Sequence, residues 1–81
     1  MNQLETTIVE CAEEELVTLL NPPPEWDFTS RLDYTGAYQA AMAYCKLAHI
    51  ADSGLAEACT AKLLAIEEQA TAAFVKSDVM K

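Results

Sequence analysis

Cysteine and histidine are the side chains of this sequence that are best suited to chemistry. Cys45 and His49 are four residues apart, which would make them neighbours on one face of a helix. That arrangement suits a thiol nucleophile beside its base, and with Cys11 and Cys59 it could supply four ligands for zinc. The cysteines lack the short pairwise spacing of zinc motifs, and no residue stands out to orient the histidine. We therefore expect neither a metal site nor a catalytic cysteine.

Carboxylates are the other groups that could act as acids and bases, and they cluster at residues 13–15 and 67–68. No glycine-rich phosphate loop, GxSxG or HExxH motif accompanies them. A chain of 81 residues also buries too little surface to wall off a deep pocket. The sequence therefore predicts a protein without enzymatic activity and without a cofactor.

The acidic residues are concentrated near the amino terminus. The chain carries 13 acidic and five basic residues, a formal net charge of −8. Residues 1–27 contain seven of the acidic residues and no basic one, whereas the rest of the chain is close to neutral. Such a chain is a poor ligand for nucleic acid, because that binding needs a surplus of Lys and Arg. The charge instead favours contact with a basic surface on another protein.

Nothing in the sequence predicts a membrane or a secreted location. The first residues lack the basic region and the unbroken apolar core of a signal peptide. No stretch of about 18 apolar residues runs without a charge, and an acidic helix is unsuited to anionic lipid. The three cysteines, an odd number, are expected to be reduced thiols. We expect a cytoplasmic protein without membrane contact.

Two breaks divide the chain into helical segments. Pro22–Pro24 must end a preceding helix, because proline lacks an amide hydrogen and restricts the residue before it. Asp52–Gly54 is the second break, with Gly54 suited to a left-handed position, and its shortness predicts an antiparallel hairpin of the flanking helices. Alanine is abundant and β-branched residues do not alternate, which favours helix over sheet. The sequence predicts one all-α domain over residues 1–81, a three-helix bundle with helices at about residues 3–20, 30–51 and 55–76 and a proline-rich loop at 21–29.

The first predicted helix is amphipathic. Asn2 is its expected N-cap, with Glu5 as the partner in a capping box. Glu15 breaks the pattern, because it projects near the middle of the apolar arc, where it needs a polar partner or water. The arc is formed by Leu4, Ile8, Cys11, Ala12, Leu16, Leu19 and Leu20. The opposite, acidic half holds Glu10, Glu13 and Glu14.

The second predicted helix is apolar around about three quarters of its circumference, which predicts a central helix buried on at least two sides. Gly36, Ala40 and Ala43 fall on one line, where another helix could approach closely. Tyr34 and Tyr38 lie on a second line beside small residues, a pattern suited to an interface or to the end of the bundle.

The third predicted helix has a single main apolar stripe, made of Leu55, Cys59, Leu63, Ile66, Ala70, Ala73 and Phe74. Behind this stripe lies a row of alanines beside an outward Leu64. In a monomer the row simply favours helix at the surface, and in a dimer it would form the seam.

The loop NPPPEWDF, before the second helix, is stiffened by three prolines. Trp26 and Phe28 are large anchors flanked by Glu25 and Asp27, a mixture found at interface hot spots. The alternative is that both rings fold back and close the end of the bundle, and the sequence leaves these two roles open.

These features favour a small, acidic, non-catalytic protein-binding module, an inhibitor or adaptor that covers a basic or functional surface of a larger protein. The residues expected to bind the partner are Glu10, Glu13, Glu14, Glu25, Trp26 and Asp27. In size, charge and lack of motif, the chain resembles the small accessory proteins that phages make against host enzymes and defence complexes, anti-CRISPR proteins among them. This resemblance is one of composition, and it assigns no site residue.

The alternative function is that of a homodimeric helical subunit in an assembly. Three helices of this size cover a helix that is apolar on three sides only incompletely, which argues for a partner of some kind. The residues expected to form the dimer contact are Tyr34, Tyr38, Ala58, Ala61, Leu64 and Ala65.

Overall fold

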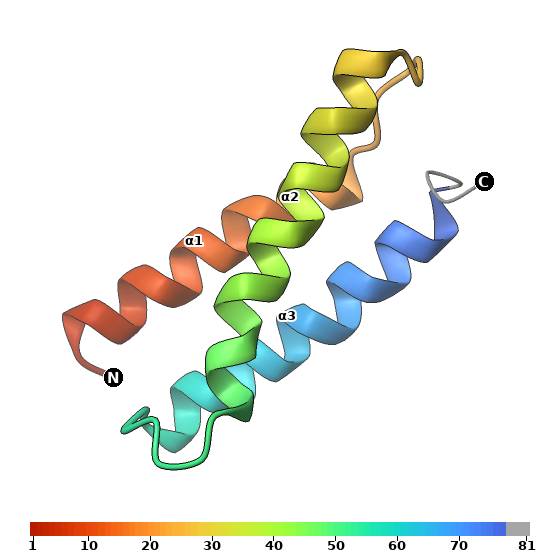
Figure 1. The fold of residues 1–81 in the computed structure, drawn as a ribbon. Coiled ribbons are helices and arrows are strands. Elements are labelled where there is room, and N and C mark those ends of the chain that lie inside the picture. The colour runs from red at the N-terminus through yellow and green to blue at the C-terminus, as the bar shows by residue number, and fades with distance from the viewer. Residues whose placement is uncertain (78–81) are drawn as a thin grey trace.

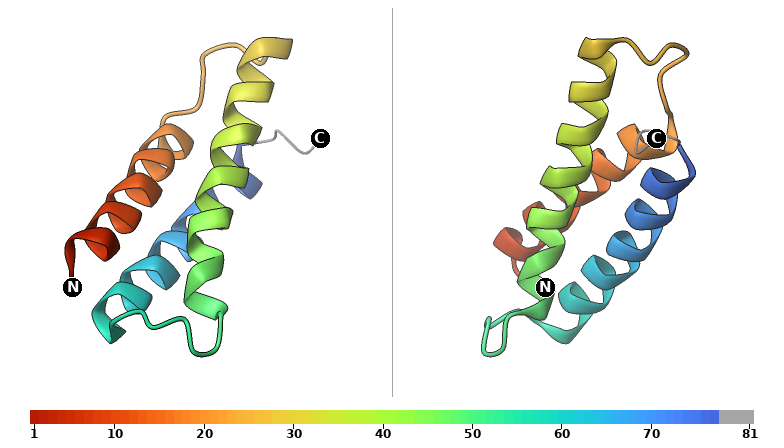
Figure 2. Two further views of the ribbon diagram at one scale, coloured as in Figure 1. Left: turned by 60° about the vertical axis from the view of Figure 1, so that its left-hand side comes forward. Right: turned by 45° about the vertical axis from the view of Figure 1, so that its right-hand side comes forward.

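The computed structural model describes residues 1–77 of the 81-residue chain. It contains three α-helices, α1 (Gln3–Leu20), α2 (Phe28–Lys46) and α3 (Glu57–Lys76), with a 3-10 turn, η1 (Leu47–His49), directly after α2 (Figure 1). Each α-helix packs against the other two, and no strand occurs within residues 1–77. Figure 2 shows α3 returning alongside α2 in the opposite direction. The predicted all-α three-helix bundle is confirmed.

α1 begins and ends where its sequence predicts. The side-chain oxygen of Asn2 accepts a hydrogen bond from the Glu5 amide at 2.8 Å, and the Glu5 carboxylate accepts one from the Asn2 amide at 3.1 Å. This capping box satisfies amide groups that the first helical turn leaves free. The helix ends at Leu20, and Asn21 alone separates it from the three prolines, which cannot continue a helix.

α2 begins at Phe28, two residues before the predicted start at residue 30. The carboxylate of Asp27 caps the helix by accepting a hydrogen bond from the Ser30 amide at 2.8 Å. Aspartate is a strong capping residue, whereas the sequence predicts that Asp27 lies in the loop and binds a partner. Asp27 therefore has a structural role in the fold.

α2 also ends before the predicted end at residue 51. The α-helix stops at Lys46, and the chain tightens into η1 before it becomes extended at Ile50. Asp52 (φ 60°) and Gly54 (φ 79°) then both adopt left-handed conformations, and together they reverse the chain. The left-handed Gly54 agrees with the prediction, whereas the connection to α3 is longer than the predicted turn.

α3 begins at Glu57, two residues after the predicted start. Ala56, which precedes it, has no side chain that could cap the helix. The carboxylate of Glu5, in the first turn of α1, accepts a hydrogen bond from the Ala56 amide instead. Glu5 is only 6% exposed, so this carboxylate joins the beginnings of α1 and α3 inside the bundle.

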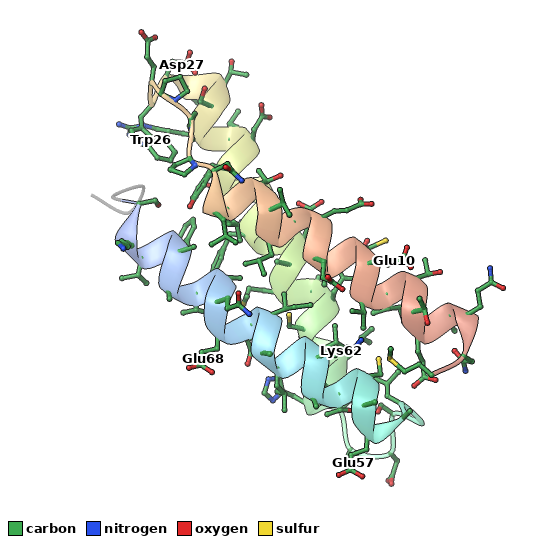
Figure 3. The ribbon with its side chains drawn as sticks, turned by 180° about the vertical axis from the view of Figure 1, so that it is seen from behind. Glu10, Trp26, Asp27, Glu57, Lys62 and Glu68 are labelled. Carbon is green, nitrogen blue, oxygen red and sulfur yellow. The ribbon has the colours of Figure 1, made fainter. Side chains whose placement is uncertain are left out.

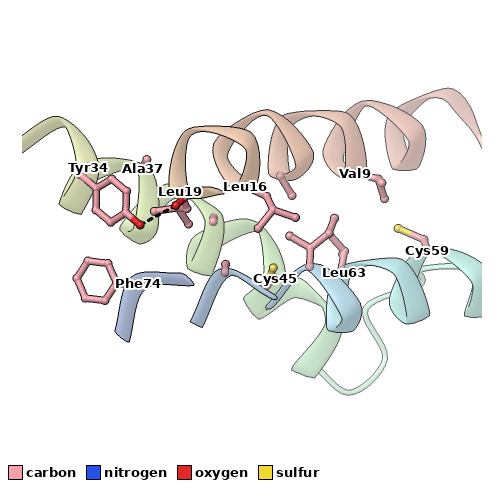
Figure 4. Close-up of a cluster of buried hydrophobic side chains, with 13 residues drawn as sticks. Val9, Leu16, Leu19, Tyr34, Ala37, Cys45, Cys59, Leu63 and Phe74 are labelled. Carbon is pink, nitrogen blue, oxygen red and sulfur yellow. Dashed lines mark hydrogen bonds between the residues drawn. The ribbon is translucent and has the colours of Figure 1, made fainter. Parts of the chain in front are cut away.

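The core is a single cluster of side chains from all three helices (Figure 4). The predicted stripe of α3 is confirmed by the burial of Cys59, Leu63, Ile66, Ala70 and Phe74. The buried face of α1 is turned relative to the prediction, since Val9 is buried whereas Leu4 and Leu20 are exposed. The reason is that this face has to meet both α2 and α3. Glu15 consequently lies half-buried at the edge of the face rather than in its middle.

α2 is not the helix buried on several sides that its composition predicts. Its buried residues form one face, made of Tyr34, Ala37, Ala41 and Cys45. On the opposite face, Phe28 and Leu32 are 77% and 57% exposed, and Gly36 is exposed as well. Since α1 and α3 both pack against the one buried face, the described chain has no element left to cover the other.

Candidate functional site

The acidic half of α1 faces away from the bundle. Glu10, Glu13 and Glu14 are all exposed, and we call these three residues the acidic face; Glu10 is labelled in Figure 3. Glu13 lines a shallow groove between α1 and α3, opposite Lys62. Within residues 1–77, the one contact shorter than 4 Å between a basic and an acidic side chain joins His49 to Glu67. Glu10, Glu13 and Glu14 thus make no salt bridge in this region, with Lys62 on the far side of the groove from Glu13, and they could meet cations from another molecule.

Glu15 is directed towards α2 and does not belong to the acidic face. It is half-buried, and it lies near Tyr44 of α2. The pKa of Tyr44 is raised, first by a hydrogen bond with Cys11, and further by the negative charges of Glu15 and Glu14. The charges of Glu14 and Glu15 thus act on a side chain of α2, whereas Glu13 lies on the other side of α1, at the groove next to α3.

Two of the acidic residues near the amino terminus serve the fold. The Glu5 carboxylate accepts hydrogen bonds from the amides of Ala56 and Asn2, which lower its pKa. The Asp27 carboxylate caps α2, and its hydrogen bond from the Ser30 amide lowers its pKa. Since both groups are engaged by backbone amides, the surface that could bind a partner is smaller than the count of charges in the sequence suggests.

The loop before α2 is held against the bundle by two contacts. The Trp26 ring packs edge-on against Tyr34, with ring centroids 5.1 Å apart and an interplanar angle of 87°. Nε of Arg31 donates a hydrogen bond to the Trp26 carbonyl oxygen at 3.0 Å. Trp26 is half-buried, whereas Glu25 and Phe28 are exposed. Trp26 thus closes the end of the bundle and keeps part of its surface open, and Phe28 projects into solvent.

The residues predicted to bind a partner occupy two separate areas. The molecule is elongated, with principal extents of 40 × 20 × 14 Å. Figure 3 shows Glu10 within the length of α1, whereas Trp26 and Asp27 lie in the loop beyond the end of that helix. The acidic face of α1 and the Glu25–Asp27 loop are therefore distinct surfaces that one large partner would have to span.

Comparisons of the chain with protein-family models, with curated proteins and with solved structures found no match. Among the helices of the described region, none is long and apolar enough to cross a membrane.

The cysteine and histidine residues of α2 and η1 are not arranged as a reactive pair. Cys45 is fully buried, and burial, together with the charge of Glu67, raises the pKa of its thiol to about 11. The thiolate is the nucleophilic form, so this group is unreactive near neutral pH. His49 is exposed, and its Nε2 lies 2.9 Å from a carboxylate oxygen of Glu67 on α3. Within residues 1–77, no three His, Cys, Asp or Glu side chains are grouped so that they could hold a metal ion.

The residues predicted for self-association are divided between the core and the surface. Tyr34 is 2% exposed, and its hydroxyl donates a hydrogen bond to the Leu19 carbonyl oxygen at 2.7 Å. In the single chain the ring therefore lies inside the bundle, and its role in self-association stays a prediction. Tyr38 is half-buried and stacks on Phe74 with ring centroids 4.0 Å apart. The α3 row remains at the surface, with Ala58, Ala61, Leu64 and Ala65 all exposed.

One further surface is not predicted from the sequence, and we call it the outer face of α2. It consists of Phe28, Leu32, Gly36, Ala40 and Ala43, which recur at helical spacing opposite the buried residues of the helix. The line of small residues is recognisable in the sequence, whereas Phe28 is expected there as part of the loop. The outer face is therefore mostly apolar, with the exposed amide of Gln39 in its middle and the exposed Lys46 at its end.

Proposed function

We propose that this protein is a non-catalytic protein-binding module whose acidic face docks on a basic surface of a larger protein. The observation that supports the proposal is the exposure of Glu10, Glu13 and Glu14 without a cationic partner in the described part of the chain. Charges of opposite sign accelerate the encounter of two proteins and act over about 8 Å at physiological salt.

The Glu25–Asp27 loop would extend this contact at the end of the bundle. Glu25 is exposed, and the open part of the Trp26 ring offers an apolar anchor beside it. Tryptophan is enriched among the residues that dominate binding energy at interfaces. Because the loop is already held by Arg31 and Tyr34, little ordering would be required on binding.

The activity of this module would follow from the partner surface that it covers. A small acidic protein bound there would inhibit or scaffold its partner in the cytoplasm, as phage accessory proteins do when they cover a functional surface of a host enzyme or defence complex. Binding would require no cofactor and no metal ion.

Charge reversal at matched positions tests this proposal. We would compare Glu10→Lys with Glu14→Lys on the acidic face against Glu57→Lys with Glu68→Lys on α3, since all four residues are exposed. Both double variants change the net charge equally, so that only the position of the charge differs. The measurement is capture of the partner from lysate, followed by mass spectrometry and by titration of the purified pair at rising salt.

The acidic-face variant is expected to lose its partner, and the α3 variant to retain it with weakened binding at high salt. Equal losses in the two variants would show that net charge alone matters. An unchanged partner set with the acidic-face variant would exclude this face as the contact.

The second candidate function, a homodimeric structural subunit, is favoured by one observation. The outer face of α2 leaves Phe28 and Leu32 in solvent, which a monomer gains nothing by exposing. This surface is independent of the acidic face, because it lies on a different helix.

A further inference from the structure

The outer face of α2 is mostly apolar, in a chain whose net charge is −8; its middle holds the uncharged polar Gln39, and its one charged residue, Lys46, lies at the end of the helix. Its large side chains, Phe28 and Leu32, lie one helical turn apart and are both exposed. Asp33 is the one acidic residue within α2, and helical spacing places it at the margin of the face. Two copies of so acidic a chain repel each other over most of their surface, and this face is one on which they could meet.

Gly36, in the middle of the outer face, has no role in the fold of the single chain. A Cβ atom added there would meet nothing within 4 Å, and the residue lies within α2, where glycine is less favourable than alanine. No close contact inside the chain therefore requires a glycine at this position, although glycine destabilises the helix. A close approach by the backbone of another molecule would explain why glycine occurs here. Ala40 and Ala43, which also have small side chains, continue this part of the surface towards the end of the helix.

The outer face is complementary to itself when two copies run in opposite directions. Its bulky residues, Phe28 and Leu32, lie at the beginning of α2, and its small residues lie in the middle and near the end. The distance from Phe28 to Ala43 along the helix is about 22 Å, at 1.5 Å per residue. An antiparallel pair would place the large side chains of each copy over the small residues of the other, whereas a parallel pair would bring large against large.

The charges at the two ends of α2 favour the same direction. Glu25 and Asp27 lie just before the helix, and Lys46 is its last residue. In an antiparallel pair each Lys46 would lie near the acidic loop of the other copy, and in a parallel pair the two loops would repel each other. Shape and charge therefore select one arrangement.

We propose that this protein forms a two-fold symmetric homodimer in which the outer faces of α2 pack against each other in antiparallel orientation. The contact is isologous, since the same surface of each copy is used. It leaves the acidic face on α1 uncovered, so the dimer would present two such faces to its partners. This inference does not rest on the proposed binding of a basic partner.

The first test is sedimentation equilibrium of the full chain over a range of concentrations. Because one pair of helix faces is a small interface, we expect a dissociation constant of about 10–100 μM. A monomer that persists at ten times the upper end of this range would overturn the proposal, and would leave the outer face as a contact for a different protein.

Gly36→Leu and Ala61→Leu form a matched pair of variants that locates the interface. Each replaces a small, exposed residue in a helix by leucine, one on the outer face of α2 and the other in the alanine row of α3. Since a Cβ at Gly36 meets nothing, Gly36→Leu should leave the monomer folded, which circular dichroism would verify. We expect it to raise the dissociation constant at least about tenfold, with Ala61→Leu unchanged. The reverse result would assign the dimer to α3 and overturn the proposal.

The direction of the two helices is tested by exchanging charges. Lys46→Glu should weaken the dimer several-fold, and adding Glu25→Lys to it should restore much of the loss. Both residues are exposed and lie at helix or loop ends, so the fold should tolerate either change. Further weakening by the second change would exclude the antiparallel arrangement.

Discussion

The two ends of the bundle are closed by different chemistry. At one end, the Phe74 ring stacks with the rings of Tyr34 and Tyr38, with centroid distances of 6.0 and 4.0 Å, and Trp26 packs edge-on against Tyr34. At the opposite end, one carboxylate, that of Glu5, accepts amide hydrogen bonds that join the beginnings of α1 and α3. The first end depends on burial of aromatic surface and the second on an ionised group.

This difference determines how each end should respond to its surroundings. Contacts between buried rings are insensitive to proton and salt concentration, whereas a hydrogen-bonded carboxylate loses its advantage when it is protonated. It also separates the acidic residues by role, because Glu5 and Asp27 hold the fold and Glu10, Glu13 and Glu14 do not. Mutations that test whether surface carboxylates bind a partner should therefore leave Glu5 and Asp27 unchanged.

The largest effect is expected from removal of the central ring of the aromatic end. Phe74→Ala should lower the free energy of unfolding by about 3–5 kcal/mol, the usual cost of truncating a buried Phe. A domain of this size has about 4–12 kcal/mol in total, so the variant would lose between about a quarter of its stability and all of it. Urea unfolding, followed by circular dichroism, measures this loss.

Phe28→Ala is the matched control, because the same truncation is made at a ring that lies in solvent. At protein concentrations too low for association, it should change the free energy of unfolding by no more than about 0.5 kcal/mol. Similar losses in the two variants would contradict the burial of Phe74 at the closed end.

A smaller effect is expected from the Tyr34 hydroxyl, which makes a buried polar contact at the aromatic end. Tyr34→Phe keeps the ring but removes the donor to the Leu19 carbonyl oxygen, leaving that acceptor at the buried end of α1. The expected cost is about 1–3 kcal/mol. Tyr38→Phe, which keeps the ring that stacks on Phe74, serves as the control and should cost less. If the two substitutions cost the same, the hydrogen bond contributes nothing beyond the ring.

The comparison also shows which features could be predicted from the sequence. The bounds of α1 and the buried stripe of α3 follow from local patterns, namely a capping box and a 3.6-residue period, and both are confirmed. The contacts that close the two ends could not be predicted, because they join residues far apart in the chain, such as Glu5 with Ala56.

The outer face of α2 illustrates a different difficulty. Its apolar composition predicts a helix buried on several sides, whereas the single chain buries one face of it, because composition does not distinguish a contact within the chain from one with another molecule. In the acidic face the opposite holds, since exposure of Glu10, Glu13 and Glu14 followed directly from their position opposite the apolar arc. What such a face binds is not encoded in its periodicity, so the partner stays a proposal.

The smallest effect, and the sharpest contrast with the aromatic end, is expected from Glu5→Gln as the pH falls. The pKa of Glu5 is lowered in the folded protein, chiefly by the hydrogen bond from the Ala56 amide, so below about pH 4.5 the unfolded chain takes up the proton first. The stability that Glu5 provides is thus fully present above that pH and is lost as the pH falls further. Glu5→Gln lacks this titration, so the difference in urea midpoint between wild type and variant should shrink from neutral to acid pH.

Asp27, whose pKa is also lowered, is present in both proteins, so its contribution cancels in that difference. Glu10→Gln removes the same charge from the exposed acidic face, and Tyr34→Phe changes the aromatic end without changing any charge near neutral pH. If the carboxylate of Glu5 closes its end of the bundle as an ionised acceptor, only Glu5→Gln should show the narrowing difference. A difference that stays constant over the whole pH range would mean that Glu5 acts through its shape alone, and the two ends would then be closed by packing alike.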